Sequence, residues 1–564
     1  MTCLLRLCLL GLMLLAGPVL PQTAETPAIE RRAEMPENPQ GRLDHILRRG
    51  TLIVGVKDDY PPMGYRDPSN GRIVGFEPDM ARAIAARLGV ALDLVPVTSN
   101  NRLGRVNQGQ IDLVIATMGD TAERRGQAGL IQPNYYASGV ALYGRSDHPY
   151  TDWGQLRGRP VCLVQGAYFN RILDDTYLVS AQYYPSSRDA LLALRQDACV
   201  GWAFDDVALV SLAAEEADAN FTVKLPSILA TPWAIAVAQG EETADWGLFL
   251  SDLMAEWHAQ GKFLELQDKW GLLPNPYLAT AQEIWARSGE DGFYCARDPE
   301  TGDYTATCVT TDVLRTGAPP VDVPAWAEAI QNATGWDLSV LFDAYDRTRL
   351  TRGLGMTLAL SLCAILGALL IGITLGLINA GLSQAALLGR LFRAPVLAVI
   401  TLARMTPPIL QLYIVFFGLG GLMSNAGHVT PGAFVTAALI FSFYAGATNA
   451  VLITHGLQQE RAAHPELDLI HALPKALIRS YDGLVSTCVN IVKAAGMASA
   501  IALTELIATV NLIITEGGNA SVLMNGLLVL YFLFVMSVLW LFQRVRRVLL
   551  RAPASRSTVQ GLSE

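Results

Sequence analysis

Apolar and amphipathic segments alternate along the first half of the chain. Short apolar runs at 51–56, 92–97 and 111–118 have the length of buried strands. Between the first two, the amphipathic segment 76–89 stops at a glycine, as a helix commonly does. The pattern therefore predicts strands that alternate with helices, which is typical of a parallel sheet.

A second set of the same kind follows. Residues 160–166 and 199–204 have the pattern of apolar strands, and the segment 187–196 between them that of a helix. A long amphipathic helix over 251–271 closes the series. Two alternating sets predict an α/β protein of two lobes, each with its own sheet, and a cleft between them.

The pattern changes at Leu354, where membrane-length apolar segments begin. The first, 354–379, holds no charged residue and is long enough to cross a bilayer, which takes about 20 apolar residues. Further candidate spans follow at 395–422, 431–453, 488–514 and 522–543. We expect an all-α transmembrane domain of about five helices after the two lobes.

The positions of the arginines test this topology. If the two lobes lie outside the cell membrane, five spans place the C-terminus inside. Arg390, Arg393 and the four arginines between 544 and 551 then fall inside, in line with the positive-inside tendency. The three arginines between 347 and 352 fall outside and oppose it. The balance favours five spans.

The first residues have the composition of a secretory signal. One arginine lies within a short apolar run, and small residues follow it, with a possible cleavage site near Ala24. An uncleaved anchor is the alternative. The expected domains are a signal peptide 1–24, a leader 25–42, a two-lobed α/β domain 43–278, a loop-rich linker 279–345, a transmembrane domain 346–550 and a cytoplasmic tail 551–564.

Composition and charge narrow the class of protein. With 51% hydrophobic and 16% charged residues, the chain is more apolar than an ordinary soluble protein. Its net charge of −9 comes without a basic stripe, which argues against nucleic-acid binding. No His or Cys spacing indicates a metal site, and no Gly-x-x-x-x-Gly-Lys-Ser/Thr sequence is present to bind ATP. We expect no cofactor.

Four cysteines would face an oxidising compartment outside the membrane. Cys295 and Cys308 bracket a turn rich in Gly and Asp that could close as a small disulfide loop, with two unpaired thiols as the alternative. Cys162 with Cys199 is a weaker candidate pair, because both lie in apolar strand-like runs where buried thiols are common.

Two strand ends carry residues that suit a free amino acid. Thr117 and Gly119 stand just before Arg124, so backbone N–H groups, a hydroxyl and a guanidinium could share a carboxylate. Asp205 follows an apolar strand of the second lobe and could take an ammonium. Taken singly, Arg124 could be a solvated helix residue and Asp205 a helix N-cap.

The order of these residues resembles the polar amino-acid periplasmic binding proteins of bacterial ABC importers. The likeness covers about 50–271 and includes GTLIVGVKDDYPPMGY, TAER and WAFDDVAL. It implies a type II two-lobed fold. It also implies ligand contacts in which Tyr60 stacks on the ligand, Arg124 grips the carboxylate with Thr117 and Gly119, Asp205 takes the ammonium, and Gln165 and Gly166 form a ligand-facing turn.

Lys57 bears on which side chain is bound. It stands at the end of the first strand, where a cation would favour an acidic or amide side chain by charge complementarity. The alternative is a surface lysine beside Asp58 and Asp59.

The second half resembles the permeases of the same importers. LARMTPPILQLYIVFFGLG at 402–420 is similar to one of their spans. The resemblance implies an ATPase-coupling loop, here Glu460, Ala462, Ala463 and Pro474, although Glu466 stands where the family has a glycine. Lys493 and Glu505 are ionisable residues in an apolar span and are predicted to line a pore, because a charge in a membrane usually faces a polar interior. For Lys493, an interfacial location near the start of the span is the alternative.

We therefore expect a fused solute-binding and permease subunit that imports an acidic or other polar amino acid across the bacterial inner membrane. It would be a transporter subunit and not an enzyme, acting as a homodimer with a separate ATPase chain. The alternatives are a membrane-anchored amino-acid receptor, either a sensor or a ligand-gated channel, and an enzyme on the same two-lobed fold.

Overall fold

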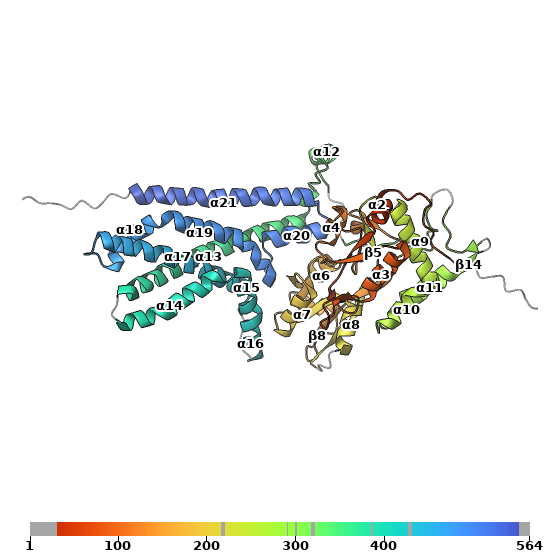
Figure 1. Cartoon of the computed structure of the whole chain (residues 1–564), viewed down its shortest axis with the longest axis horizontal. Coiled ribbons are helices and arrows are strands. Elements are labelled where there is room, and N and C mark those ends of the chain that lie inside the picture. Colours follow the sequence, from red (N-terminus) through yellow and green to blue (C-terminus); the bar gives the residue numbers. More distant parts are fainter. Residues whose placement is uncertain are drawn as a thin grey trace, which may run out of the picture.

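The computed structural model has an α/β body at one end and a helical body at the other (Figure 1). It describes residues 31–215, 220–289, 292–298, 302–316, 322–384, 387–426 and 431–551. The predicted signal peptide, the start of the predicted leader and the tail after Arg551 lie outside the described residues.

The first lobe is built on a five-stranded sheet of order β5-β1-β6-β13-β7. Its strands are β1 (Thr51–Val56), β5 (Ala91–Pro96), β6 (Leu113–Ile115), β7 (Gly129–Leu130) and β13 (Ala236–Val237). The β1 strand pairs in parallel with β5 and β6, as the alternating pattern predicts. The helices of this lobe are α2 (Gly41–Arg49), α3 (Phe76–Leu88), α4 (Arg102–Asn107) and α5 (Ala122–Arg125).

The second lobe has its own sheet, of order β10-β9-β11-β8-β12. Its strands are β8 (Tyr136–Arg145), β9 (Pro160–Val164), β10 (Ser180–Tyr184), β11 (Gly201–Asp205) and β12 (Phe221–Trp233). Its helices are α6 (Asn170–Asp175), α7 (Ser187–Arg195) and α8 (Asp206–Glu215). A disulfide joins Cys162 of β9 to Cys199 just before β11. The predicted two-lobed α/β fold is confirmed.

The end of the binding domain differs from the predicted boundary at 278. After α9 (Asp245–Ala259) and α10 (Lys262–Lys269), helix α11 (Pro276–Ala286) runs across that position. Asn275 caps α11, and its buried Trp285 packs with the disulfide Cys295–Cys308 in one apolar cluster. The start of the predicted linker is thus packed on the α/β body.

The helical body contains candidate membrane spans. Its helices are α12 (Ala325–Thr334), α13 (Ala344–Gln384), α14 (Leu387–Met405), α15 (Pro408–Tyr413), α16 (Gly420–Asn425), α17 (Ala433–Ala463), α18 (Leu469–Arg479), α19 (Tyr481–Ala494), α20 (Leu506–Thr515) and α21 (Ala520–Arg551). Among the described residues, four helices are long and apolar enough to cross a membrane, or five if one bent pair counts as a span.

Two predicted spans are interrupted. The span predicted at 395–422 bends by 107° between α14 and α15, where Thr406 and Pro407 break the helix. The span predicted at 488–514 is not one helix, because α19 passes into a 3₁₀ turn that ends at Ala502 in a left-handed conformation. A new helix, α20, starts at Leu506.

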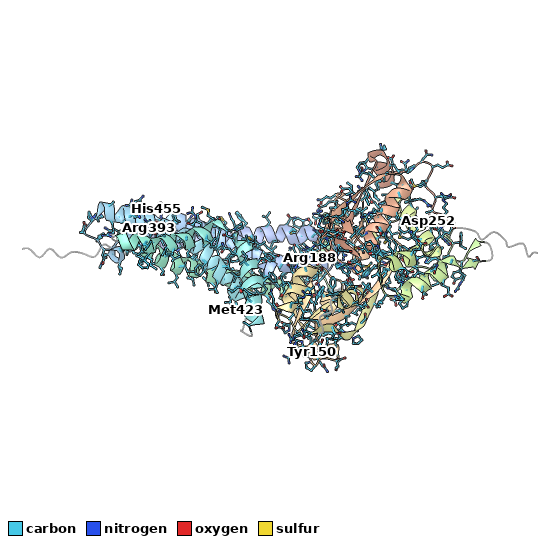
Figure 2. The ribbon with its side chains drawn as sticks, turned by 60° about the horizontal axis from the view of Figure 1, so that its bottom comes forward. Tyr150, Arg188, Asp252, Arg393, Met423 and His455 are labelled. Atoms are coloured by element: carbon cyan, nitrogen blue, oxygen red, sulfur yellow. A yellow bond between two sulfur atoms is a disulfide. The ribbon has the colours of Figure 1, made fainter. Side chains whose placement is uncertain are left out.

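The two ends of the helical body differ in their surroundings. Figure 2 shows Arg393 and His455 at the end far from Asp252 of the α/β body, and α18 lies at that far end too. Arg349 lies instead at the near end and pairs with Glu516 at 2.6 Å. This ion pair gives a structural reason for one of the arginines that oppose the positive-inside tendency.

The α/β body contacts the helical body mainly through its second lobe. Arg171 of α6 pairs with Asp343 at 3.0 Å, and Tyr345 donates its hydroxyl hydrogen to Asp174 at 2.7 Å. The Gln196 amide donates to the backbone carbonyl of Phe417 at 2.6 Å. These contacts join the two bodies along one side of the second lobe.

Candidate ligand-binding cleft

The first-lobe side of the cleft is a turn after β6 that two buried charged residues hold in place. Thr117 has a left-handed backbone (φ 46°), which is uncommon for a residue other than glycine. Its N–H donates to Glu77 Oε1 at 2.6 Å, and Tyr135 donates to the same oxygen. Arg102 donates to the carbonyls of Ala116 and Thr117. Glu77 and Arg102 were not predicted as site residues.

Arg124 lies at the base of the cleft and is only 4% exposed, so it is not a solvated helix residue. Thr121 caps the short helix α5 by accepting from the Arg124 N–H. The guanidinium donates to the carbonyls of Gly119 at 2.9 Å and of Gly166 at 3.0 Å, the second across the cleft. Burial, helped by repulsion from Arg102, lowers the pKa of Arg124 to about 9. Its five N–H donors exceed these two acceptors and suit a carboxylate.

Asp205 faces Arg124 from the second lobe, at the end of β11. Its Oδ2 accepts from the Tyr60 hydroxyl at 2.9 Å, while its Oδ1 is buried without a partner among the described residues. Burial raises the pKa of this carboxyl to about 7, with the Tyr60 hydrogen bond opposing. A buried carboxylate oxygen without a donor is costly, and a ligand ammonium would supply the missing donor.

Tyr60 bridges the two lobes through that hydroxyl. Its ring lies 4.9 Å from the ring of Phe204 and 6.4 Å edge-on from that of Trp233. Tyr168 adds a further ring, 6.0 Å from the Arg124 guanidinium carbon. Aromatic side chains therefore lie beside both Asp205 and Arg124. The stacking of Tyr60 on a ligand stays a prediction.

Lys57 is buried beside the cleft and not on the surface, with an exposed fraction of 3%. Its ammonium donates to Ser99 Oγ at 2.8 Å. Burial lowers the pKa of Lys57, and the nearby Asp59 carboxylate opposes that shift. The alternative of a surface lysine is thereby excluded.

The predicted turn Gln165–Gly166 meets the first lobe. Gly166 has a left-handed backbone (φ 78°), and a Cβ there would stand 2.8 Å from the Ser99 backbone. Ser187 also donates to Asp59 Oδ2 of the other lobe at 2.8 Å. With Tyr60–Asp205 and Arg124–Gly166, these contacts describe lobes closed on each other.

The predicted ATPase-coupling residues lie where α17 ends and α18 follows, at the end of the molecule far from the cleft (Figure 1). Ala462, Ala463 and Pro474 are exposed there. Glu460 is buried and accepts from the Arg479 guanidinium at 2.7 Å, so it fixes the corner between the two helices.

The two predicted pore residues differ in their surroundings. Lys493 is exposed on α19, within a helix of membrane length. Glu505 is fully buried and caps α20, where its carboxylate accepts from the N–H groups of Ile507 and Ala508 at 2.8 Å each. The capping of a helix N-terminus accounts for Glu505 without a pore, because the first N–H groups of a helix need acceptors.

Comparison with known proteins identifies the α/β body. The fold and cleft are those of a two-lobed solute-binding domain, and residues 52–273 match the family described as bacterial extracellular solute-binding proteins, family 3. A glutamine-binding protein of Geobacillus stearothermophilus is 28% identical over 205 residues, which is 35% of this chain and 76% of that protein. The chain therefore carries a family 3 solute-binding domain.

Two further proteins show the range of this similarity. A crystal structure of a mutant of ArgBP from T. maritima is 27% identical, with a TM-score of 0.39, and covers 41% of this chain and 99% of that one. Cyclohexadienyl dehydratase of Pseudomonas aeruginosa is 35% identical over 89 residues, 16% of this chain and 33% of that protein.

Proposed function

We propose that this chain is the receptor and permease subunit of an amino-acid importer of the ABC class. The observation that carries the proposal is the pair Arg124 and Asp205, one from each lobe, both buried where the hydrogen bonds Tyr60–Asp205 and Arg124–Gly166 join the lobes. A free amino acid presents a carboxylate and an ammonium at a fixed separation, and the two side chains offer one partner for each. The same chain continues into helices long enough to cross a membrane.

The substrate is proposed to be an acidic or amide amino acid. Lys57 is buried and has spare donors beyond the bond to Ser99. A buried ammonium that faces a bound side chain favours oxygen acceptors and disfavours cations. The similarity to a glutamine-binding protein points to the same class.

The helical body is proposed to form half of the translocation path, in a homodimer in the inner membrane. Lys493 is exposed on a membrane-length helix, and a charge at such a position is costly against lipid. A second copy that covers this face would turn Lys493 toward a polar path. Ala462, Ala463 and Pro474, exposed at the far end, would contact a separate cytoplasmic ATPase.

The test is isothermal titration of the full-length chain in lipid nanodiscs against the common amino acids. We expect one acidic or amide amino acid to bind, and Arg124→Ala to weaken it more than about 100-fold, because a buried charge loses its partner. Arg157→Ala, at an exposed position, is the matched control. Unchanged affinity in Arg124→Ala would exclude the proposed site.

Two alternative functions, a sensor or channel and an enzyme, are distinguished from transport by further measurements. A sensor or channel would bind the amino acid without ATP-dependent uptake into vesicles. An enzyme would convert it, so analysis of the titrated sample by mass spectrometry must return the amino acid unchanged for the transport proposal to hold.

A further inference from the structure

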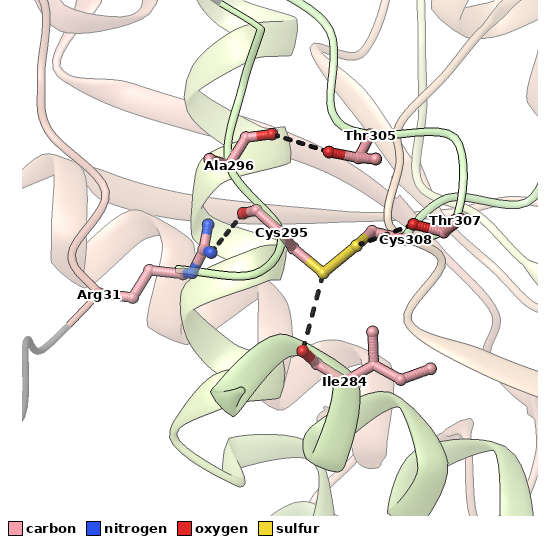
Figure 3. Close-up of a disulfide and its surroundings, with 7 residues drawn as sticks. All are labelled: Arg31, Ile284, Cys295, Ala296, Thr305, Thr307 and Cys308. Atoms are coloured by element: carbon pink, nitrogen blue, oxygen red, sulfur yellow. Dashed lines mark hydrogen bonds between the residues drawn. A yellow bond between two sulfur atoms is a disulfide. The ribbon is translucent and has the colours of Figure 1, made fainter. Parts of the chain in front are cut away.

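A segment outside the family match wraps the first lobe. We call residues 302–316 the strap. The disulfide Cys295–Cys308 ties its first part to the packed end of α11, where Cys295 lies beside the carbonyl of Ile284 (Figure 3). The match to the solute-binding family ends at residue 273, so the strap is an addition to that domain.

The strap contacts the short helix that carries Arg124. The Ala122 N–H donates to the carbonyl of Leu314 at 3.1 Å. The backbone N–H and the hydroxyl of Thr316 donate to the two carboxylate oxygens of Glu123, at 3.0 and 2.8 Å. Ala122 and Glu123, the first two residues of α5, are therefore both held by hydrogen bonds from the strap.

Thr310 completes a second set of contacts, on the other side of Arg124. Its carbonyl accepts from the Arg125 guanidinium at 2.7 Å, and its hydroxyl donates to Asn134 Oδ1 at 2.7 Å. Arg125 and Asn134 both donate to Asp120, which is fully buried one residue after Gly119. The strap thus supports the turn whose carbonyl holds Arg124.

A helix of four residues does not hold its own shape. The cost of helix nucleation is recovered only over many residues, so α5 depends on neighbours for its geometry. Thr316 and Thr310 supply such neighbours on the two flanks of Arg124, while the Arg124 side chain points the other way, to Gly119 and Gly166.

We propose that the strap is a positioning element for Arg124 and so sets the affinity for the ligand carboxylate. The inference rests on the proposed function, since it assumes an amino acid in the cleft. Thr316 and Thr310 are positioning residues: they touch no ligand and act through α5.

The test compares Thr316→Val with Thr311→Val, an exposed threonine of the same strap, in the full-length chain in nanodiscs. Each is titrated with the amino acid that binds the native chain and with its α-carboxamide. We expect Thr316→Val to weaken binding of the amino acid about tenfold, because the charged Glu123 loses the hydrogen bond from the hydroxyl and keeps the one from the backbone N–H, and to weaken binding of the carboxamide less than about twofold. Thr316→Ser, which keeps the hydroxyl, should bind the amino acid with the affinity of the native chain, and so should Thr311→Val.

Equal losses for the two ligands would mean general destabilisation and would overturn the inference, as would unchanged affinity in Thr316→Val. The double variant Cys295→Ser with Cys308→Ser provides a second measurement and is expected to show the same selective loss. If the native chain binds no amino acid, the proposed function fails and the strap proposal falls with it; if the native chain binds and the variants bind equally well, the strap proposal fails alone.

Discussion

The α/β body and the helical body both contain buried charged side chains with partners, but they differ in what they leave exposed. In the α/β body, Arg124, Asp205 and Asp120 are buried and have partners from the same body or the strap. In the helical body, the apolar window of α21 is only 6% buried, and Lys493 is exposed. By the proposal, lipid covers the exposed apolar surface of the helical body, and another copy covers Lys493.

Beside Arg124→Ala, the largest effect is expected at Asp205, the proposed partner of the ligand ammonium in the α/β body. Asp205→Asn should weaken amino-acid binding about 100-fold, because the ligand ammonium loses its only predicted carboxylate in a buried site. Isothermal titration of the full-length chain measures it. A loss below about fivefold would show that Asp205 does not hold the ammonium. Asp206→Asn is not a suitable control, since Asp206 accepts from Ser138 and Ser227, so Asp147→Asn, on the exposed surface, serves.

The next largest effect is expected in the helical body. Lys493→Met should reduce vesicle uptake more than about tenfold and leave ligand affinity unchanged, because a polar path would lose its charge while the cleft stays intact. Lys262→Met, in the exposed part of α10, controls for loss of a lysine. Normal uptake by Lys493→Met would remove this residue from the path.

The affinity of the α/β body for its ligand should also depend on pH. The Asp205 carboxyl has a pKa of about 7, and it must be ionised to take an ammonium. Affinity should therefore fall about tenfold per pH unit below pH 7. Titrations between pH 5 and 8 measure this slope. A flat profile would contradict the role of Asp205.

The stability of the ligand-free chain should change in the opposite direction. The folded-state pKa of Asp205 lies above the ordinary value, so the folded state binds this proton more tightly than the unfolded state. The free energy of unfolding should rise as the pH falls from 8 toward 5. Asp205→Asn should remove this contribution, as thermal unfolding in the same buffers would detect.

The smallest effect is expected at an exposed ion pair of the helical body, in contrast to a buried ion pair of the α/β body. Glu256, 4% exposed, accepts from Arg87 and from the Ala33 N–H, so Glu256→Gln should lower the free energy of unfolding by about 3 kcal/mol. Asp482 pairs with Arg546 on the surface, and Asp482→Asn should change it by less than about 0.5 kcal/mol. Thermal unfolding of the full-length chain measures the change for each variant. Equal changes for Glu256→Gln and Asp482→Asn would contradict the expected difference between a buried and an exposed ion pair.

The sequence predicts the fold from periodicity and the cleft from strand ends. Strands at 51–56 and 199–204 follow from alternation, and the contact of Tyr60 with Asp205 across the lobes follows from the rule that strand ends face a cleft. Glu77 and Arg102 could not be foreseen, because they reach the turn at Thr117 from helices distant in sequence.

The fold of the helical body is harder to predict from the sequence, for a related reason. A hydropathy pattern gives the length of an apolar segment but not the positions where its helix breaks. The segment 488–514 is therefore predicted as one span, whereas the structure has two helices there. The break follows from the left-handed Ala502, which carries no residue signal, and from Glu505, which caps the next helix. The bend after Thr406 does have a signal in the Pro-Pro pair that follows it.

In the proposed function, one chain both captures an amino acid and provides its path across the membrane. The most direct measurement is ATP-dependent uptake of the bound amino acid by right-side-out membrane vesicles from cells that carry this chain, compared between the native chain and Arg124→Ala at equal amounts of protein. We expect uptake by the native chain and its loss in Arg124→Ala. Uptake that persists in Arg124→Ala, or no uptake by a native chain that binds the amino acid, would contradict the proposed function.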